Sequence, residues 1–106
     1  MFVRNVTSLA QFNPGKMGKS TVVQGASLFA GLNSFEPGQE HAPHIHAGQD
    51  KLYFILEGSG VVQIGAQTAL LTAGDAAFAP SGVVHSIQNP GAERLVVMAV
   101  LAPPPK

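Results

Sequence analysis

The sequence predicts an all-β domain, built as a sandwich or barrel of antiparallel strands. Short runs of β-branched, aromatic and small apolar residues recur along the chain. Gly, Pro, Asn or Asp separates these runs roughly every 8–12 residues, a spacing typical of such folds. No amphipathic stretch of helical length interrupts them. The 106 residues suffice for one domain and contain no internal repeat, so we expect a single barrel.

The chain divides into an arm, a barrel and a tail. Residues 1–19 are expected to form a loose arm with a short edge strand at 3–6, because Asn-Pro-Gly and Met-Gly-Lys segments follow that strand. The barrel is expected to cover residues 20–102. The Pro-rich tail, 103–106, is expected to be extended or disordered. Within the barrel, runs that end at turn residues predict strands at 21–23, 28–35, 52–56, 61–64, 69–72, 76–79, 83–88 and 95–101.

Composition excludes several classes of function. The chain has no cysteine, so disulfides, thiolate metal sites and cysteine nucleophiles are excluded. A net charge of zero without a basic run argues against nucleic acid as a partner. No segment approaches the roughly 20 apolar residues that span a bilayer. No signal peptide is visible, so we expect a cytoplasmic protein without a membrane partner.

The small number of charges predicts self-association. Charged residues make up 11% of the chain and apolar residues 45%. Typical soluble proteins are about 25% charged. We expect a second copy of the chain to cover an apolar face, which would give a homodimer. The alternative is a neutral surface rich in Ala and Gly.

A cluster of histidines marks the candidate site. His41, His44 and His46 precede the apolar run 52–56. Side chains alternate along a strand, so His44 and His46 should point to the same side and could share a divalent metal. His85, just after the Pro-Ser-Gly turn, is the natural third ligand. The alternative is a half-exposed strand face without a metal.

Two motifs resemble those of the cupin family. The first runs from Gly38 over five residues to His44-Ile45-His46 and on to Gly58. The second runs from Gly74 through Pro80-Ser81-Gly82 to His85 and Asn89, and matches every fixed position. The resemblance implies a double-stranded β-helix, or jelly-roll, barrel that is usually dimeric. It also implies one divalent transition metal (Fe, Mn, Ni, Cu or Zn) inside the barrel, with His44, His46 and His85 as ligands.

Lys51 departs from the family pattern, because it occupies the position of the motif's glutamate. An ammonium has no lone pair to donate and repels a nearby cation. The metal could be held by three histidines alone, or Gln49, Asp50 or His41 could contribute. Lys51 could instead serve as an acid–base group or an anion anchor, in a site with or without metal. In the remaining alternative, Lys51 extends outward to pair with Asp50 or Glu57.

Two further residues are candidates for the surroundings of the site. Tyr53 shares strand parity with Lys51, so an inward Lys51 would place Tyr53 beside the pocket. There it would either donate a hydrogen bond to substrate or act as a core tyrosine whose hydroxyl reaches the backbone. His41 lies three residues before His44, off the same-face register, and is expected at the rim.

The sequence supports three functional hypotheses. The first is a metal-dependent enzyme, a dioxygenase or isomerase of a small oxygenated molecule, with Lys51 and Tyr53 as catalytic groups. The second is a non-catalytic module that binds a small ligand, with Lys51 as anion anchor. The third is a barrel that stabilises a partner. Histidine binds metal only when neutral, so metal should be lost below about pH 6.

Overall fold

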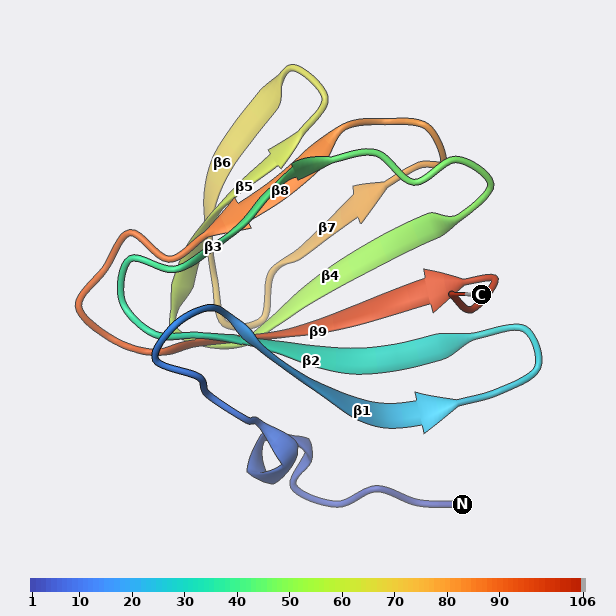
Figure 1. Ribbon diagram of the computed structural model, residues 1–106, viewed down its shortest axis with the longest axis horizontal. Coiled ribbons are helices and arrows are strands. Elements are labelled where there is room, and N and C mark those ends of the chain that lie inside the picture. Colours follow the sequence, from blue (N-terminus) through green and yellow to red (C-terminus); the bar gives the residue numbers. More distant parts are fainter. Residues whose placement is uncertain (106) are drawn as a thin grey trace.

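Nine β-strands and one short 3-10 helix account for the regular structure of residues 1–105, the part of the chain that the computed structural model describes (Figure 1). The strands form between turns, where apolar and polar residues alternate or where several apolar residues follow one another. Their bounds are β1 (Gly18–Gln24), β2 (Phe29–Phe35), β3 (Glu40–His44), β4 (Asp50–Glu57), β5 (Ser59–Ile64), β6 (Gln67–Thr72), β7 (Ala76–Ala79), β8 (His85–Gln88) and β9 (Leu95–Ala102).

The strands make two antiparallel sheets whose inner faces enclose the core. One sheet has the strand order β1-β2-β9-β4-β7 and the other β3-β8-β5-β6. Figure 1 shows the four-stranded sheet lying across from the five-stranded one. The arrangement is that of a jelly roll, so the predicted fold class is confirmed. The core contains Phe35, Tyr53, Ile55, Val62, Ile87, Leu95, Val97 and Ala99.

Strand β4 shows how alternation separates the two faces. Lys51, Tyr53 and Ile55 are buried, whereas Leu52 between them is 39% exposed. Burying a side chain the size of Ile55 stabilises the fold by about 1.5–3 kcal/mol. The same alternation turns Lys51 inward, where it lines a cavity. The inward orientation considered from the sequence is therefore the one the chain adopts.

Asn89 fastens one end of the sandwich. Its side chain is 1% exposed, and its amide nitrogen donates to the carbonyls of Phe35 and Glu93, at 3.2 Å and 2.8 Å. Its amide oxygen accepts from the backbone N–H of Gly91. Asn89 therefore joins the end of β2 to the turn between β8 and β9. A buried amide that satisfies both its donor and acceptor capacity specifies the local geometry.

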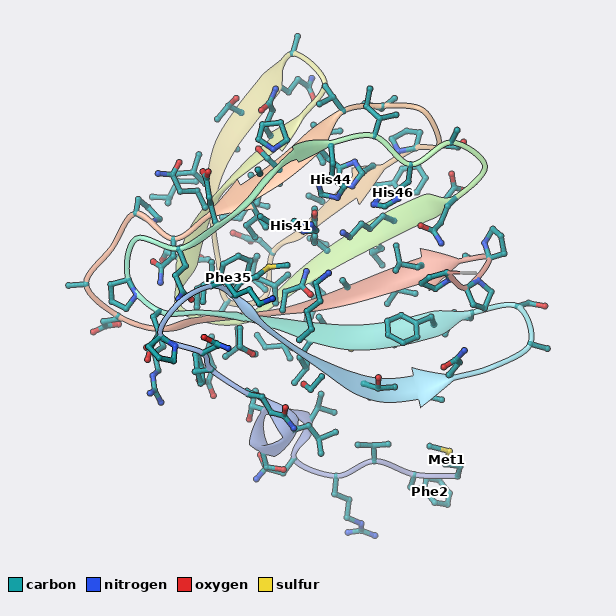
Figure 2. The ribbon with its side chains drawn as sticks, viewed as in Figure 1. Met1, Phe2, Phe35, His41, His44 and His46 are labelled. Atoms are coloured by element: carbon teal, nitrogen blue, oxygen red, sulfur yellow. The ribbon has the colours of Figure 1, made fainter. Side chains whose placement is uncertain are left out.

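The N-terminal arm differs from its prediction. The expected strand at residues 3–6 is wrong, because Val6–Leu9 form the 3-10 helix η1 and residues 1–4 are without strand pairing. The arm approaches the sheet so closely at Gly18 that a Cβ there would overlap the carbonyl of Gln11. Its first residues project outward, with Met1 90% and Phe2 93% exposed (Figure 2).

The remaining predicted strands are present with shifted ends. β1 begins at Gly18, earlier than expected, and β8 begins only at His85. No bounds are predicted for β3, although His44 and His46 are expected on one strand face, because its residues alternate weakly and contain a proline. In the tail, Pro103–Pro105 border a cavity, and Lys106 lies outside the described residues. Within the described part of the chain, no helix has the length and apolar character needed to cross a membrane.

Replacing Gly58 with alanine should destabilise the fold more than replacing Gly74. Both glycines have positive φ, 80° and 96°. Left-handed backbone costs an alanine about 1–2 kcal/mol. A Cβ at Gly58 would also overlap the carbonyl of Arg94, whereas at Gly74 it would meet no atom of the described residues within 4 Å. We expect Gly58→Ala to lower the free energy of unfolding by about 3 kcal/mol or more and Gly74→Ala by about 1 kcal/mol. Equal losses in urea titrations would contradict this assignment.

Candidate metal centre

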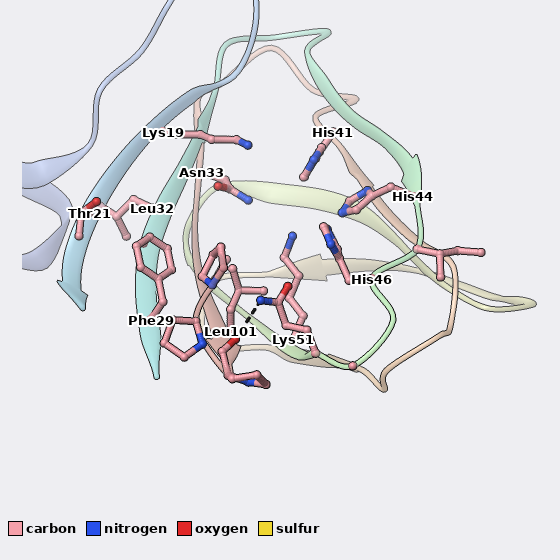
Figure 3. Close-up of a pocket in the computed structure, with 18 of the residues that line it drawn as sticks. Lys19, Thr21, Phe29, Leu32, Asn33, His41, His44, His46, Lys51 and Leu101 are labelled. Carbon is pink, nitrogen blue, oxygen red and sulfur yellow. Dashed lines mark hydrogen bonds between the residues drawn. The ribbon is translucent and has the colours of Figure 1, made fainter. Parts of the chain in front are cut away.

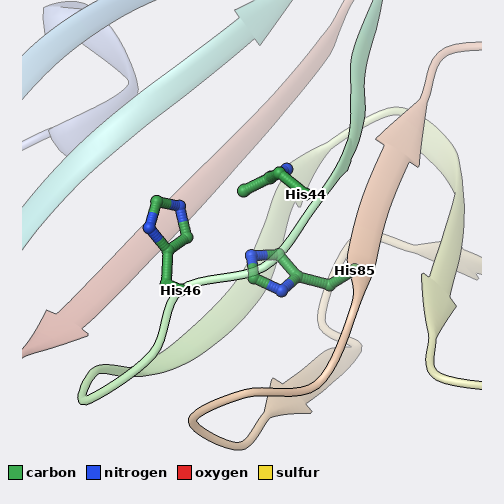
Figure 4. Close-up of side chains that lie close together, drawn as sticks. All are labelled: His44, His46 and His85. Carbon is green, nitrogen blue, oxygen red and sulfur yellow. The ribbon is translucent and has the colours of Figure 1, made fainter.

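Three histidines from two neighbouring segments converge between the sheets. His44 ends β3, His85 begins β8, and the two residues are paired across the strands. His46 lies in the loop after β3. Figure 4 shows the three side chains facing one another, and one ring nitrogen from each lies within 4.8 Å of those of the other two. This spacing allows one cation to contact all three.

The hydrogen bonds of the rings decide which nitrogens are free. Nδ1 of His44 lies 2.7 Å from the carbonyl of Ala42, and Nδ1 of His85 lies 3.0 Å from that of Val83. A carbonyl only accepts, so each Nδ1 must carry the proton. Nε2 of both rings is buried and has no hydrogen-bond partner among residues 1–105. Lone pairs held this way are characteristic of metal-ligating imidazoles, so the residues fit a divalent transition metal.

His46 reaches the cluster by a route that strand alternation does not predict. β3 stops at His44, so His46 is a loop residue rather than a member of the strand face. Its loop is fastened to the turn before β8: Gly82 donates to the carbonyl of His46, and Gly48 donates to Oγ of Ser81 at 2.6 Å. Ser81 N–H in turn donates to Asp50. These bonds hold the loop of His46 beside His85.

A β-bulge brings His41 onto the same face as His44. His41 pairs with Ile87 and His44 with His85. The step between these two pairs is therefore three residues along β3 but only two residues along β8. The extra residue restores the inward orientation that a spacing of three would lose. The rings of His41 and His44 lie 4.0 Å apart between centroids. The expectation that His41 lies off the face is therefore wrong. Figure 2 shows both side chains between the sheets.

Lys51 is buried beside the histidines, and no acidic group of residues 1–105 pairs with it. Its side chain is 4% exposed, and its Nζ lies 4.9 Å from the centroid of the Tyr53 ring. Burial, and secondarily the charge of Lys19, lowers its pKa to about 8. In the described residues the ion pair is Arg94–Glu36, so Lys51 does not extend outward to Asp50 or Glu57. Figure 3 shows its amine directed into the cavity towards the histidines.

The surroundings keep the imidazoles neutral. Burial is the main cause that lowers the pKa of His41 to about 3 and that of His44 to about 4. It also lowers the pKa values of His46 and His85. The charge of Lys51 adds to this effect at every one of the four rings. Unprotonated nitrogens are therefore available well below neutral pH.

Tyr53 presents an unpaired hydroxyl. The residue is fully buried, its ring lies 6.1 Å from that of His85, and its hydroxyl has no hydrogen-bond partner in the described part of the chain. Burial raises the pKa of the phenol, so the hydroxyl keeps its proton. One alternative considered from the sequence is a core tyrosine whose hydroxyl bonds to the backbone. The structure of residues 1–105 does not show that bond. It remains free to donate inside the barrel.

A cavity of about 970 Å³ is lined by Lys51 and by His41, His44 and His46. Lys19 and Asn33 also contribute to its wall (Figure 3), and none of the described residues that line it is Asp or Glu. The sequence analysis missed Lys19 and Asn33. Alternation along 28–35 places Asn33 on the same face as Phe35, a signal that could have found it. The wall therefore offers cations and hydrogen-bond donors without a compensating negative charge.

Gln49 and the C-terminal prolines form part of the cavity's edge. The amide nitrogen of Gln49 donates to the carbonyl of Pro103 at 2.9 Å. Pro103, Pro104 and Pro105 all border the cavity. The bond fixes the amide group of Gln49 at this edge, and a role for Gln49 as an oxygen ligand stays a prediction. Asp50 is engaged with Ser81 instead.

Comparisons with known proteins agree with the geometry. A family model described as a cupin domain matches residues 31–101. An oxalate-binding protein from Thermotoga maritima is 35% identical over 85 residues, which are 80% of this chain and 69% of that protein. The crystal structure of TT1209 from Thermus thermophilus superposes with a TM-score of 0.94 and 41% identity, covering 99% of this chain and 100% of that one.

A second solved structure is similar to a smaller extent. It is a predicted oxalate decarboxylase from Thermotoga maritima, with a TM-score of 0.77 and 27% identity, covering 83% of this chain and 81% of that chain. The region matched by the family model contains both histidine segments, β3 and β8, together with the strand of Lys51. Fold, motif spacing and family model coincide on the same residues. This chain therefore belongs to the cupin family.

Proposed function

We propose that this protein binds a small carboxylate in its barrel, on a divalent transition metal held by His44, His46 and His85. The observation that carries the proposal is the cavity wall, where unpaired imidazole nitrogens stand beside a buried ammonium and no carboxylate of the described residues lines the space. Such a wall favours an anion. The similar oxalate-binding protein supports a small carboxylate as the class of ligand.

Each residue has a role in this proposal. The imidazoles hold the ion through Nε2 where Nδ1 is committed to a carbonyl, as in His44 and His85. A bound divalent ion would supply a Lewis acid for the oxygen atoms of the ligand. Lys51 pairs with the ligand's negative charge, at a depth where water screens it little. Fe, Mn, Ni, Cu and Zn all accept imidazole, so the donor set suits each of them.

A metal-dependent enzyme, dioxygenase-like or isomerase-like, is the second candidate function. Two observations favour it: the unpaired hydroxyl of Tyr53, and the pKa of Lys51 at about 8. A group whose pKa lies near neutral can take up and release a proton. Lys51 would then move a proton while Tyr53 donates a hydrogen bond. Recovery of a bound carboxylate unchanged after prolonged incubation with metal and O2 would favour binding over catalysis.

We further propose that the protein is a homodimer joined through the outer face of the five-stranded sheet. Leu52 and Phe78 are cross-strand neighbours there, 39% and 53% exposed. Adjacent apolar side chains on a chain with so few charges gain free energy when a second copy covers them.

Removing His85 should abolish metal binding. We expect about one metal ion per chain in the native protein after dialysis against Mn²⁺ or Zn²⁺, because three imidazoles meet at the site. His85→Ala should leave almost none, measured by plasma mass spectrometry. His41→Ala is the matched control: it removes a neighbouring histidine that lies outside the group of three, and should retain the metal. Equal stoichiometry in both variants would contradict the ligand set.

Metal should be retained to lower pH than free histidine would allow. A proton competes with the metal for each ring nitrogen, and burial has lowered the pKa of His44 from 6.5 to about 4. Release of Zn²⁺ to a chromophoric chelator should therefore occur at roughly pH 4–5 instead of near 6. Circular dichroism on the same samples verifies that the chain is still folded. Half-release at pH 6 or above would contradict the lowered pKa of His44.

Charging the outer face should dissociate the dimer. Leu52→Lys combined with Phe78→Lys places like charges at the proposed contact, and we expect the mass measured by light scattering to fall from two chains to one. Leu70→Lys is the control, because Leu70 is 61% exposed on the other sheet. It should leave the dimer intact. A native protein that is monomeric at micromolar concentration would refute the proposal.

A further inference from the structure

We infer that Lys51 is a nucleophile, whose buried amine forms an imine with the carbonyl carbon of a small oxo acid inside the barrel. This activity goes beyond the binding of a carboxylate proposed above, and it needs no metal ion. The position of the amine carries it: Lys51 is buried in the wall of a cavity, and none of the described residues that line this cavity is a carboxylate.

Strand β4 fixes the amine in the cavity wall. It pairs with β9 on one side and with β7 on the other. The side chain of Lys51 is 4% exposed, and its Nζ lies 4.9 Å from the centroid of the Tyr53 ring. Figure 3 shows the amine directed into the cavity. The amine therefore meets molecules that enter the barrel.

The cavity has room for a small carbonyl compound beside this amine. Its volume of about 970 Å³ lies within the range of sites that hold small ligands. An oxo acid of the size of glyoxylate or pyruvate takes up a small part of this space. Its carbonyl carbon can therefore approach Nζ of Lys51.

No acidic group of the described residues holds the amine in an ion pair. The ion pair within residues 1–105 joins Arg94 to Glu36. The two acidic residues of β4 are engaged or turned away, because Asp50 accepts from the backbone of Ser81 and Glu57 is exposed at the end of the strand. A lysine without such a partner loses its proton more readily and can then attack carbon.

The surroundings also favour the uncharged amine. Burial, with a smaller contribution from the charge of Lys19, lowers the pKa of Lys51 to about 8. At pH 7 roughly a tenth of these amines are then uncharged, against fewer than about one in a thousand for an ordinary lysine. The uncharged amine has the lone pair that the reaction needs, and desolvation is a usual way of activating lysines that form imines.

The reaction balances without an oxidant or a reductant. The lone pair of Nζ forms a bond to the carbonyl carbon, and the electron pair of the C=O bond moves to oxygen. A proton passes from nitrogen to this oxygen, which gives a carbinolamine. The C–O bond then breaks as nitrogen forms a double bond to carbon. Both hydrogen atoms of the amine leave with the oxygen as water, and Lys51 carries the imine.

The charges of the wall favour a carbonyl compound that is also an anion. Lys19 lines the same cavity, and none of the described lining residues is Asp or Glu. A protonated imine on Lys51 keeps a positive charge at its position. A carboxylate next to the carbonyl group is attracted to both positive groups, whereas a neutral aldehyde is not. Oxo acids are therefore the substrate class.

Lys19 is the internal reference for this reactivity. It lines the same cavity from β1, but its side chain is exposed, so water solvates its ammonium group. Both amines meet the same reagent in the same molecule. The ratio of their labelling rates therefore cancels the intrinsic reactivity of the reagent and reports the effect of the fold.

The test traps the imine in the native protein. Cyanoborohydride reduces an imine formed with glyoxylate to a stable secondary amine, and a chelator in the buffer keeps the histidines free of metal. Peptide mass spectrometry gives the labelling rate of each lysine. At pH 7 we expect Lys51 to be labelled at least about tenfold faster than Lys19, because its amine is desolvated. Propanal, a neutral aldehyde, should give a smaller ratio.

Two variants and one condition assign the reactivity to Lys51 in the folded chain. Lys51→Arg keeps a positive charge, but its guanidinium stays protonated, so the adduct at this position should be lost while Lys19 reacts as before. Lys19→Arg is the matched control and should leave the rate at Lys51 within about twofold of the native rate. Native protein unfolded in guanidinium chloride should label both lysines at rates within about twofold, because unfolding removes the burial. Circular dichroism verifies the fold of both variants.

The outcomes are independent of the metal. If the folded native protein labels Lys51 no faster than Lys19, or if the preference survives unfolding, Lys51 is not the nucleophile. If propanal shows the same preference as glyoxylate, the nucleophile stands and the assignment of oxo acids is overturned. Metal uptake by the histidines is measured separately, so the proposed function can stand when imine formation fails.

Discussion

The pairing of β3 with β8 is the constraint on which the site depends. It sets His44 opposite His85, and the bulge in β3 turns His41 inward as well. A shift of one residue in this register would turn either histidine towards solvent. Hydrogen bonds of Ser81, before β8, and Asn89, after it, stabilise this register at both ends of the strand. Ser81 accepts from Gly48, and Asn89 donates to the carbonyl of Phe35.

Charge distinguishes this cavity more than shape does. Neutral imidazoles and a buried ammonium meet without a carboxylate among the described lining residues. An uncompensated cation in a half-buried space is unfavourable unless a ligand neutralises it. The fold tolerates Lys51 because its amine faces a wide cavity and the ring of Tyr53. A site whose positive charges have no negative partner among the described lining residues is suited to binding an anion.

Strand β4 connects the chemistry inside the barrel with the surface outside. Lys51 and Tyr53 point to the inside of the sandwich, and Leu52 between them points to the outer face. The same alternation therefore supplies both the proposed anion anchor and the proposed dimer contact. Self-association would cover the outer face and leave the cavity on the other side of the sheet. The two properties can be altered separately by substitutions one residue apart.

The sequence by itself determined the fold class, eight of the strands in approximate position and the group His44, His46 and His85, because turn residues and motif spacing are local features. Strand parity also predicted that Lys51 and Tyr53 point to the same side of the strand, and the structure decided that this side is the inner one. Only the tertiary structure decided that the arm forms a 3-10 turn, that a bulge brings His41 to the site, and that Lys19, Asn33 and Pro103–Pro105 border the cavity. These features depend on pairing between distant strands, which local sequence patterns do not specify.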